Sequence, residues 1–475
     1  MKSSKKELGT DKHGVQKSMR LGDYLGDGVG QLSLTLINML IGQLTYFYTE
    51  KAKVAAAVVA IAILIPKVID AFSDLFMGKI MDNTNSKSGK CRPWFLRMAI
   101  PAALNIVLLF TMPSGLPTYM QVVYILITNT CMSAVIYTAI AVPYSSLMAL
   151  RTESSEERGT MGIVRTIFNM LSGMLLSLTI IPITNALGGN QQAWIKFSIV
   201  IALIAGISLL IAYIFSKENV QSSEVIEVRD VEDEREKSIT FKQGMLLLLK
   251  NKFWVIMVLT SIINGINYGI MNGSLVWYAK YILGNDNYVS LITGVAMIPT
   301  FVGFIIVPVI AKKLGMRDTS ILAFVIGIVG CIIKAIAPTN IVAILVGTAL
   351  FGFSMMPFMS FQGGLLNNCV EYNELKYGYR LVGLTNSVNS FAGKISGGVG
   401  GSLIGWILAA SGYITGVAAE SQPQSVSIGI LIFSTYIPMA INVLMVVLLR
   451  MYTLEKDYGK IVEELKQKRA ERENR

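Results

Sequence analysis

A series of long apolar stretches is the feature that most limits how this chain can fold. Each stretch has about 20 residues with few charges, the length that an α-helix needs to cross roughly 30 Å of hydrocarbon. The stretches are continuous and do not alternate in polarity, which excludes a membrane β-barrel. Since hydrophobic residues make up 53% of the chain and charged residues only 15%, we predict an all-α integral membrane protein.

About twelve spans are predicted, in two six-helix halves separated by a hydrophilic break. The predicted spans are 24–49, 53–78, 95–113, 118–148, 160–186, 193–216, 251–282, 288–311, 318–338, 341–367, 381–411 and 427–451. The break is dense in charges of both signs, which is typical of a solvated linker. The predicted parts are a tail (1–23), an N-terminal half (24–216), the linker (217–250), a C-terminal half (251–451) and a second tail (452–475).

Positive charges gather on one side of the predicted membrane. Lysines and arginines occupy the N-terminal tail and the loops near 79–97, 151–158, 312–317 and 376–380, whereas the opposite loops near 112–118 and 184–194 have almost none. Because cytoplasmic loops carry this bias, we predict a multi-pass plasma-membrane protein with both termini in the cytoplasm. The bias also accounts for the net charge of +11. Membrane lipids, and no nucleic acid, are therefore the expected surroundings.

Three ionisable residues share one face of the span at 53–78. Lys67, Asp70 and Asp74 stand at positions i, i+3 and i+7, and a charge inside a membrane costs several kcal/mol unless it is paired. Two carboxylates one helical turn apart suit a hard monovalent cation. We therefore predict a monovalent cation site at Asp70 and Asp74, with Lys67 as a counter-charge. A network that only holds the helices together is the alternative.

Polar side chains also form a stripe in the span at 251–282. Asn264, Tyr268 and Asn272 are four residues apart, so that two amides and a phenol project from one face. Such groups suit the hydroxyls of a sugar, although hydrogen bonding between helices explains each of them as well. Further candidates for the solute site are Asn267, Gln31 and Asn389.

Glycines recur every four residues in the span at 381–411. They stand at 393, 397, 401 and 405 and form a ridge of small residues. Such a ridge lets two helix backbones approach closely. We predict that another helix packs against it.

Four segments, in chain order, carry a family resemblance. They are YFYTE at 46–50, IDAFSDLFMGKIMDNTNSKSGKCRPW at 69–94, AVPYSSLMALRTESSEERG at 141–159 and VEYNELKYGYRLVGLTNSVNSFAGKISGG at 370–398. Together they closely resemble the glycoside–pentoside–hexuronide:cation symporter family. The resemblance implies a major-facilitator fold of twelve helices in two halves. It also implies import of a sugar, glycoside or hexuronide with sodium or protons, and with lithium in some members, by a monomer without a cofactor.

The family's melibiose carrier provides a cation site for comparison. Its ligands fall on Asp70, Ser73, Asp74 and Thr138 of this chain, with Ser73 in place of an asparagine. Lys394 matches a lysine that lies near those aspartates in the family. For Lys394 the resemblance leaves two roles open, a structural salt bridge or an element that couples the cation to the solute.

The sugar site of the same carrier is matched less well. Two aspartates that bind its sugar fall near Leu32 and on Ala141 here, so both acidic anchors are predicted to be absent. Arg165 matches a family arginine beside the sugar. Its five-donor guanidinium suits sugar hydroxyls, or a carboxylate in a uronide, if it faces a cavity. Snorkelling to the cytoplasmic surface is the alternative.

Charged residues in the basic loops are candidates for an inner gate whose ion pairs break when the solute is released. They are Asp82, Arg92, Arg151, Glu371 and Arg380. Simple topology signalling by the same charges is the alternative.

We predict a transporter and not an enzyme, because the sequence contains no phosphate loop, nucleophile elbow or histidine pair. A cation-independent facilitator, or a carrier of a non-sugar solute such as a lipid, is the alternative function on the same fold.

Overall fold

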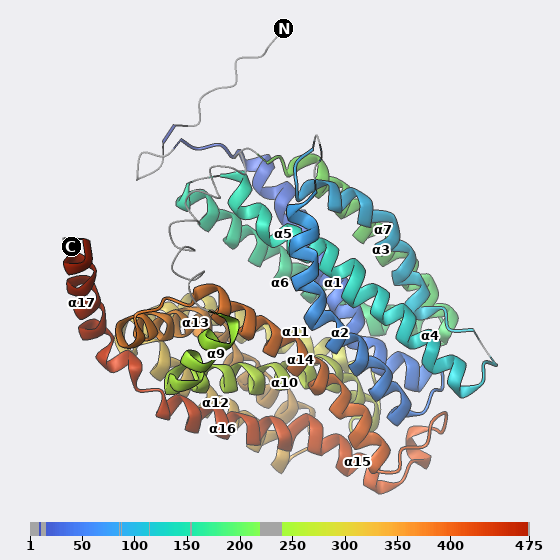
Figure 1. The fold of residues 1–475 in the computed structure, drawn as a ribbon. Coiled ribbons are helices and arrows are strands. Elements are labelled where there is room, and N and C mark those ends of the chain that lie inside the picture. Colours follow the sequence, from blue (N-terminus) through green and yellow to red (C-terminus); the bar gives the residue numbers. More distant parts are fainter. Residues whose placement is uncertain are drawn as a thin grey trace. The chain divides into compact units, whose positions relative to one another are not determined.

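The computed structural model describes residues 9–10, 16–84, 86, 88–113, 115–152, 154–218 and 240–473. Helices dominate these ranges, and within them no named β-strand forms (Figure 1). The prediction of an all-α chain is therefore confirmed. The chain divides into two compact units: unit 1 comprises Met1–Val54 and Ile61–Asp230, and unit 2 comprises Ala55–Ala60 and Val231–Arg475.

Unit 1 contains six long helical rods, two of which include a π-helical segment. Its elements are α1 (Leu21–Tyr46), η1 (Phe47–Lys51), α2 (Ala56–Asp82), α3 (Arg92–Phe110), α4 (Thr118–Thr130), η2 (Cys131–Tyr137), α5 (Thr138–Arg151), α6 (Ser155–Ala186) and α7 (Gln191–Phe215). Helix α2 belongs to unit 1 from Ile61 onward, and its first turn is assigned to unit 2. Helix α1 packs along α6 and α7, and α3 packs along α7.

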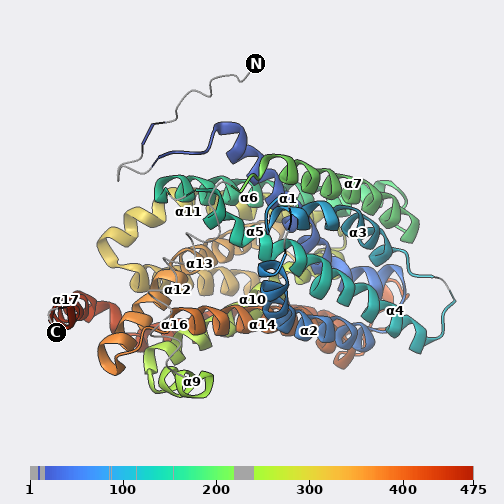
Figure 2. The same cartoon turned by 45° about the horizontal axis from the view of Figure 1, so that its top comes forward.

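Unit 2 contains six further rods and two peripheral helices. Its elements are α9 (Phe241–Lys250), α10 (Lys252–Tyr281), α11 (Tyr288–Leu314), α12 (Met316–Ile336), α13 (Ile341–Tyr377), α14 (Val382–Ala410), η3 (Ala419–Ser421), α15 (Gln424–Leu431), η4 (Ile432–Tyr436), α16 (Ile437–Met451) and α17 (Leu454–Glu473). In both views α10 and α14 lie side by side (Figures 1 and 2).

Each predicted span overlaps one of these rods. Nine of the helices in the described part of the chain are long and apolar enough to cross a membrane, and α11 makes a tenth if its two bent arms count as one span. Helix α13 continues to Tyr377, past the predicted end at 367. Its last turns are polar, and Gly378, in the left-handed conformation at φ 80°, ends it.

Close backbone contact joins α10 to α14 in unit 2. A Cβ atom on Gly400 would lie 2.2 Å from the Ile266 carbonyl oxygen, and one on Gly269 would lie 2.3 Å from the Gly397 oxygen. These positions therefore require glycine. The predicted ridge is only partly correct, because a Cβ on Gly393 or Gly401 would meet nothing within 4 Å.

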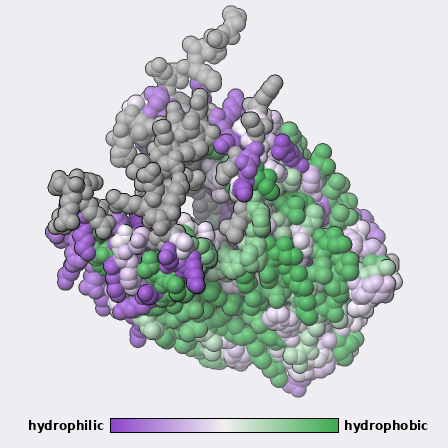
Figure 3. All heavy atoms as spheres, in the orientation of Figure 1, coloured by the Kyte–Doolittle hydropathy of each residue, from purple (hydrophilic) through white to green (hydrophobic). Residues whose placement is uncertain are grey.

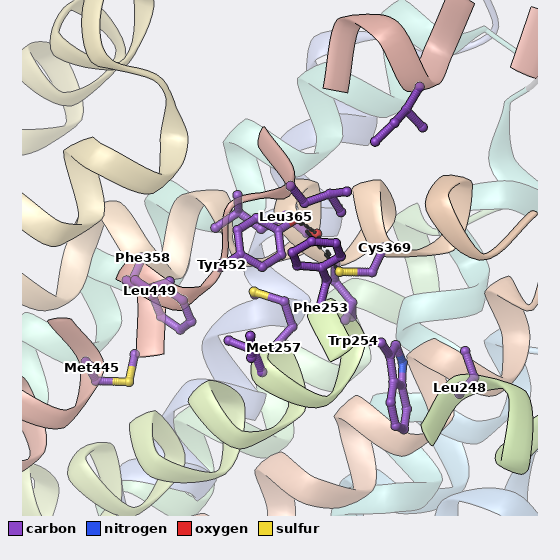
Figure 4. Packing of buried hydrophobic residues seen from close by; sticks show 14 of the residues in the cluster. Leu248, Phe253, Trp254, Met257, Phe358, Leu365, Cys369, Met445, Leu449 and Tyr452 are labelled. Carbon is purple, nitrogen blue, oxygen red and sulfur yellow. Dashed lines mark hydrogen bonds between the residues drawn. The ribbon is translucent and has the colours of Figure 1, made fainter. Parts of the chain in front are cut away.

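Apolar side chains fill the inside of unit 2 and also cover its outside. A buried cluster forms near the ends of α9, α10, α13 and α16 (Figure 4), where the Tyr452 hydroxyl donates to the Leu365 carbonyl over 2.7 Å. Hydrophobic residues also extend over much of the visible surface (Figure 3). This is the distribution expected where lipid, not water, surrounds the helices.

Candidate functional site

Three oxygen-bearing side chains of α2 and α5 meet inside unit 1. The Thr138 hydroxyl donates to Asp70 Oδ1 over 3.0 Å, and it lies 3.1 Å from the Ser73 hydroxyl. The Ser73 hydroxyl is also 2.9 Å from the Asp70 carbonyl oxygen, to which it donates. Asp70 and Thr138 are only 3% and 2% exposed. The structure thus brings together one buried carboxylate and two hydroxyls, a set of hard oxygen donors.

Local irregularities in both helices surround this cluster. The π-helical segment η2 ends at Tyr137, directly before Thr138, and π-bulges often occur at functional sites. Pro66 in α2 and Pro143 in α5 lie within one or two turns of the cluster. Because proline cannot donate to the carbonyl four residues earlier, each leaves one backbone oxygen outside the helical ladder.

The remaining charges of the predicted network lie on two helices. Asp74 and Lys67 are half-buried on α2, about one turn either side of Asp70. Lys394 is half-buried on α14, in unit 2.

A second cluster joins α1 to α6 in unit 1. Arg165 binds Asp27 through two hydrogen bonds, from Nε to Oδ2 over 2.6 Å and from Nη2 to Oδ1 over 2.9 Å. Arg151 Nη1 lies 3.3 Å from Asp27 Oδ1. Asp27 is completely buried, so two guanidinium groups surround one buried carboxylate. The two guanidinium groups offset part of the cost of burying a carboxylate in this position.

Tyr144 and Asn169 extend this cluster. The Arg165 guanidinium lies over the Tyr144 ring at 3.8 Å, and the Tyr144 hydroxyl donates to the Asp27 carbonyl over 2.7 Å. The Thr35 hydroxyl donates to Asn169 Oδ1 over 2.7 Å. Because residues four apart share a helix face, Asp27, the half-buried Gln31 and Thr35 line one side of α1.

Asp27 is the residue that sequence reasoning missed. The family resemblance places the acidic position of the first span near Leu32, and Asp27 lies five residues before it. A carboxylate inside an otherwise apolar helix was the available signal, because such groups are rare unless they are paired or functional. Ala141 is half-buried on α5, three residues before Tyr144, and adds no charge.

The polar residues of unit 2 separate into two groups. Gln362 Nε2 on α13 donates to the Ser261 hydroxyl over 2.6 Å and to Asn389 Oδ1 on α14 over 3.4 Å. These contacts link α10, α13 and α14 through side chains that are hydrogen-bond donors and acceptors. Asn267 does not take part in these contacts. It is 1% exposed, and its amide nitrogen is 4.0 Å from the Met355 sulfur.

The stripe on α10 has a local contact of its own. Asn272 Nδ2 donates to the Tyr268 carbonyl over 3.1 Å, and both side chains are half-buried. Asn264, at the other end of the stripe, is 9% exposed.

Three of the candidate gate residues have hydrogen-bond partners inside their own units. Arg92 donates to the carbonyls of Tyr213 and Ile214 at the end of α7. Arg151 donates to the Phe215 carbonyl over 3.0 Å, and Glu371 accepts from the Tyr458 hydroxyl. Of the other two, Arg380 is exposed, and the side chain of Asp82 lies outside the described residues.

The Arg92 contact has a counterpart in unit 2. Arg317 at the start of α12 donates to the Leu449 and Arg450 carbonyls at the end of α16, over 2.8 and 3.1 Å. The Glu455 carboxylate accepts the backbone N–H groups of Met316 and Arg317, each over 2.7 Å.

In unit 1, Glu218 has the same role as Glu455. Its carboxylate accepts the backbone N–H groups of Lys90, Cys91 and Arg92 over 2.8 to 3.0 Å. Both units thus cap a helix start with a carboxylate and a helix end with an arginine.

Comparison with known proteins is consistent with this architecture. The family model for MFS/sugar transport proteins matches residues 26–456. An isoprimeverose transporter of Lactiplantibacillus pentosus is 29% identical over 97% of this chain and 93% of its own length. A glucuronide carrier protein homolog of Escherichia coli K12 is 27% identical over 94% of each chain.

Solved structures show the same fold. A D-xylose-proton symporter aligns with a TM-score of 0.60 at 12% identity, over 90% of this chain and 96% of its own. The nucleoside transporter NupG, as a D323A mutant, aligns with a TM-score of 0.61 at 12% identity, over 91% of this chain and 100% of its own.

Proposed function

Because this chain belongs to the glycoside–pentoside–hexuronide:cation symporters within the MFS/sugar transport family, we propose that it imports a sugar or glycoside together with sodium or protons. The protein is a multi-pass membrane transporter and not an enzyme. Alternating access of a single chain in the plasma membrane, with both termini in the cytoplasm, is part of the proposal.

The observation that carries cation coupling is the oxygen cluster around Asp70. The Asp70 carboxylate is 3% exposed and accepts from the Thr138 hydroxyl, which lies 3.1 Å from the Ser73 hydroxyl. The cluster thus offers a charge and neutral oxygen ligands to a small cation. Asp74, one turn along α2, supplies a second carboxylate. A sodium ion or a proton at this cluster would offset charge that is otherwise costly in a membrane.

The observation that supports a neutral solute is the Asp27–Arg165 pair. Arg165 already gives two donors to Asp27, so a carboxylate on the solute would compete with Asp27 and be repelled by it. A neutral sugar hydroxyl can instead accept a hydrogen bond from a remaining Arg165 N–H group without this repulsion. We therefore favour a neutral sugar or glycoside over a hexuronide, and the relative named as an isoprimeverose transporter agrees with this choice.

Coupling between the cation and the solute follows because one helix carries residues of both clusters. Helix α5 carries both Thr138 of the cation cluster and Tyr144 of the Asp27 cluster, so a cation that shifts α5 changes both clusters. By thermodynamic reciprocity the solute must then also tighten cation binding. An inward-negative potential adds about 2.3 kcal/mol per charge per 100 mV to the driving force.

Uptake by the purified protein in liposomes tests the proposal. Labelled isoprimeverose and a labelled glucuronide are offered with an inward sodium gradient, an inward proton gradient or neither. We expect accumulation above equilibrium of the neutral disaccharide under one ion gradient, and loss of that accumulation in Asp74→Asn. Equilibration without accumulation under every gradient would instead identify a facilitator. Preference for the glucuronide would overturn the choice of a neutral solute.

A further inference from the structure

The short helix α9 has one face packed into unit 2 and one face left uncovered. Leu248 is fully buried in the cluster that contains Tyr452 and Cys369 (Figure 4), and a Cβ on Gly244 would lie 3.0 Å from Leu384. On the other side Leu246 and Leu249 are 50% and 55% exposed. Figure 2 shows α9 at the edge of unit 2.

Helical geometry places leucines and lysines together on the uncovered face. At about 100° per residue, Lys242, Leu246, Leu249 and Lys250 fall within an arc of roughly 100°, opposite Gly244 and Leu248. Both lysines are exposed. An arc that combines exposed leucine with lysine is typical of a helix lying in the interface of a bilayer.

The connections of α9 hold it level with the ends of the membrane helices. A single residue, Asn251, separates α9 from α10, and it accepts hydrogen bonds from the Phe253 and Trp254 N–H groups. Its Nδ2 donates to the Cys369 carbonyl on α13 over 3.0 Å. The backbone carbonyl of Lys250 accepts a hydrogen bond from the Tyr377 hydroxyl. The end of α9 is therefore fixed against the start of α10 and the last turns of α13.

We propose that α9 is a lipid-binding element whose leucines enter the cytoplasmic leaflet and whose lysines bind anionic phospholipid headgroups. Charge complementarity selects this occupant: Lys242 and Lys250 border the apolar arc, Lys252 follows at the start of α10, and an anionic membrane surface attracts lysines that lie near it. Because α9 contacts α10, α13 and α14, lipid bound there also fixes the ends of three membrane helices.

Spin labels on the full-length protein in nanodiscs test the contact with lipid. Leu246→Cys and Leu249→Cys are labelled in a background without the four native cysteines, and Lys460→Cys on the polar helix α17 is the matched control, because Lys460 is also exposed. We expect labels at 246 and 249 to collide more often with oxygen than with a water-soluble nickel chelate, and the label at 460 to show the reverse. The same ranking at all three positions would overturn the proposal.

Lipid composition tests the role of the lysines. With the label at Leu249, raising phosphatidylglycerol from zero to half of a phosphatidylcholine bilayer should increase the oxygen-to-nickel ratio several-fold, and Lys242→Gln with Lys250→Gln should abolish that increase. An increase that persists in the double variant, or no increase in the parent, would contradict headgroup binding. Dipolar broadening between labels would instead identify a second copy of the chain as the occupant. Each variant is first required to retain a monodisperse elution profile, and Lys242→Arg with Lys250→Arg should restore the response.

Discussion

Asp27 and Arg165 form a buried, two-point ion pair between α1 and α6, with N–O distances of 2.6 and 2.9 Å. Arg151 lies 3.3 Å from the same carboxylate and also donates to the end of α7. The Asp27 side chain thus joins three elements of unit 1 around one charge. Removing one partner of such a buried cluster costs about 3 to 5 kcal/mol, because the others remain charged in a poorly solvating environment.

Replacing Arg165 by lysine tests whether the planar guanidinium group of Arg165 binds the solute. Arg165→Lys keeps the positive charge, and hence most of the stability, but loses one of the two bonds to Asp27 and the contact over the Tyr144 ring. We expect the KM for the sugar to rise about tenfold or more, which corresponds to a loss of roughly 1.4 kcal/mol of binding free energy. The apparent Tm should change little.

The matched control for this variant is Arg158→Lys, because Arg158 donates through Nε to the Thr152 carbonyl over 2.9 Å but does not belong to the Asp27 cluster. Uptake kinetics and thermal unfolding in detergent measure both effects. An Arg165→Lys protein with an unchanged KM would assign Arg165 to structure alone.

Removing the Thr138 hydroxyl tests the cation cluster. Thr138→Val keeps the shape of the side chain but removes the donor to Asp70 and the contact with Ser73. Since a hydrogen bond to a charged group contributes about 1.5 to 3 kcal/mol, the cation concentration for half-maximal uptake should change by at least tenfold. The sugar KM at saturating cation should stay nearly constant.

Thr128→Val on α4 is the matched control for Thr138→Val. Thr128 is 6% exposed, and its hydroxyl bonds to backbone carbonyls of its own helix, those of Tyr124 and Ile125. Uptake measured across a cation titration separates the two variants. If Thr128→Val and Thr138→Val shift the titration equally, the cluster on α2 and α5 has no special role in coupling.

The helical fold could be predicted from the sequence, because the length and the hydrophobic composition of each apolar stretch identify it as a membrane-spanning helix. The contact between Asp70 and Thr138 could not. These residues are far apart in the chain, and only the family resemblance placed Thr138 near the aspartates. The pairing of Asp27 with Arg165 could not be predicted for a related reason, because it requires knowing which helices are neighbours.

Helix α9 shows a second limit of sequence reasoning. The segment 217–250 was predicted to be a linker from its charge, yet its last ten residues form a helix with a capping box between Thr240 and Gln243. Averaging over a charged segment concealed a short apolar helix at its end. The glycine ridge shows the same limit, since the register of α14 against α10 selects Gly400 and not Gly401.

The contact between α10 and α14 predicts unequal effects at neighbouring glycines. Gly400→Ala would place a methyl group 2.2 Å from the Ile266 oxygen, so a backbone must move, at a cost of about 1 to 3 kcal/mol. Gly401→Ala meets nothing within 4 Å and should be neutral or slightly stabilising, since alanine favours helix. Apparent Tm in detergent compares the two. Equal losses at both positions would refute the close approach.

The matched carboxylates Glu218 and Glu455 predict two separate local effects. Glu455→Ala removes the acceptor for the first N–H groups of α12, and Glu218→Ala does the same for α3. Because a lost helix cap costs about 0.5 to 2 kcal/mol, amide hydrogen exchange should become several-fold faster at the start of α12 in the first variant and of α3 in the second, with no change in the other unit. Glu464→Ala, at an exposed position on α17, is the control and should leave both helix starts unchanged. Faster exchange spread over a whole unit would show that these carboxylates support global stability instead of capping a single helix.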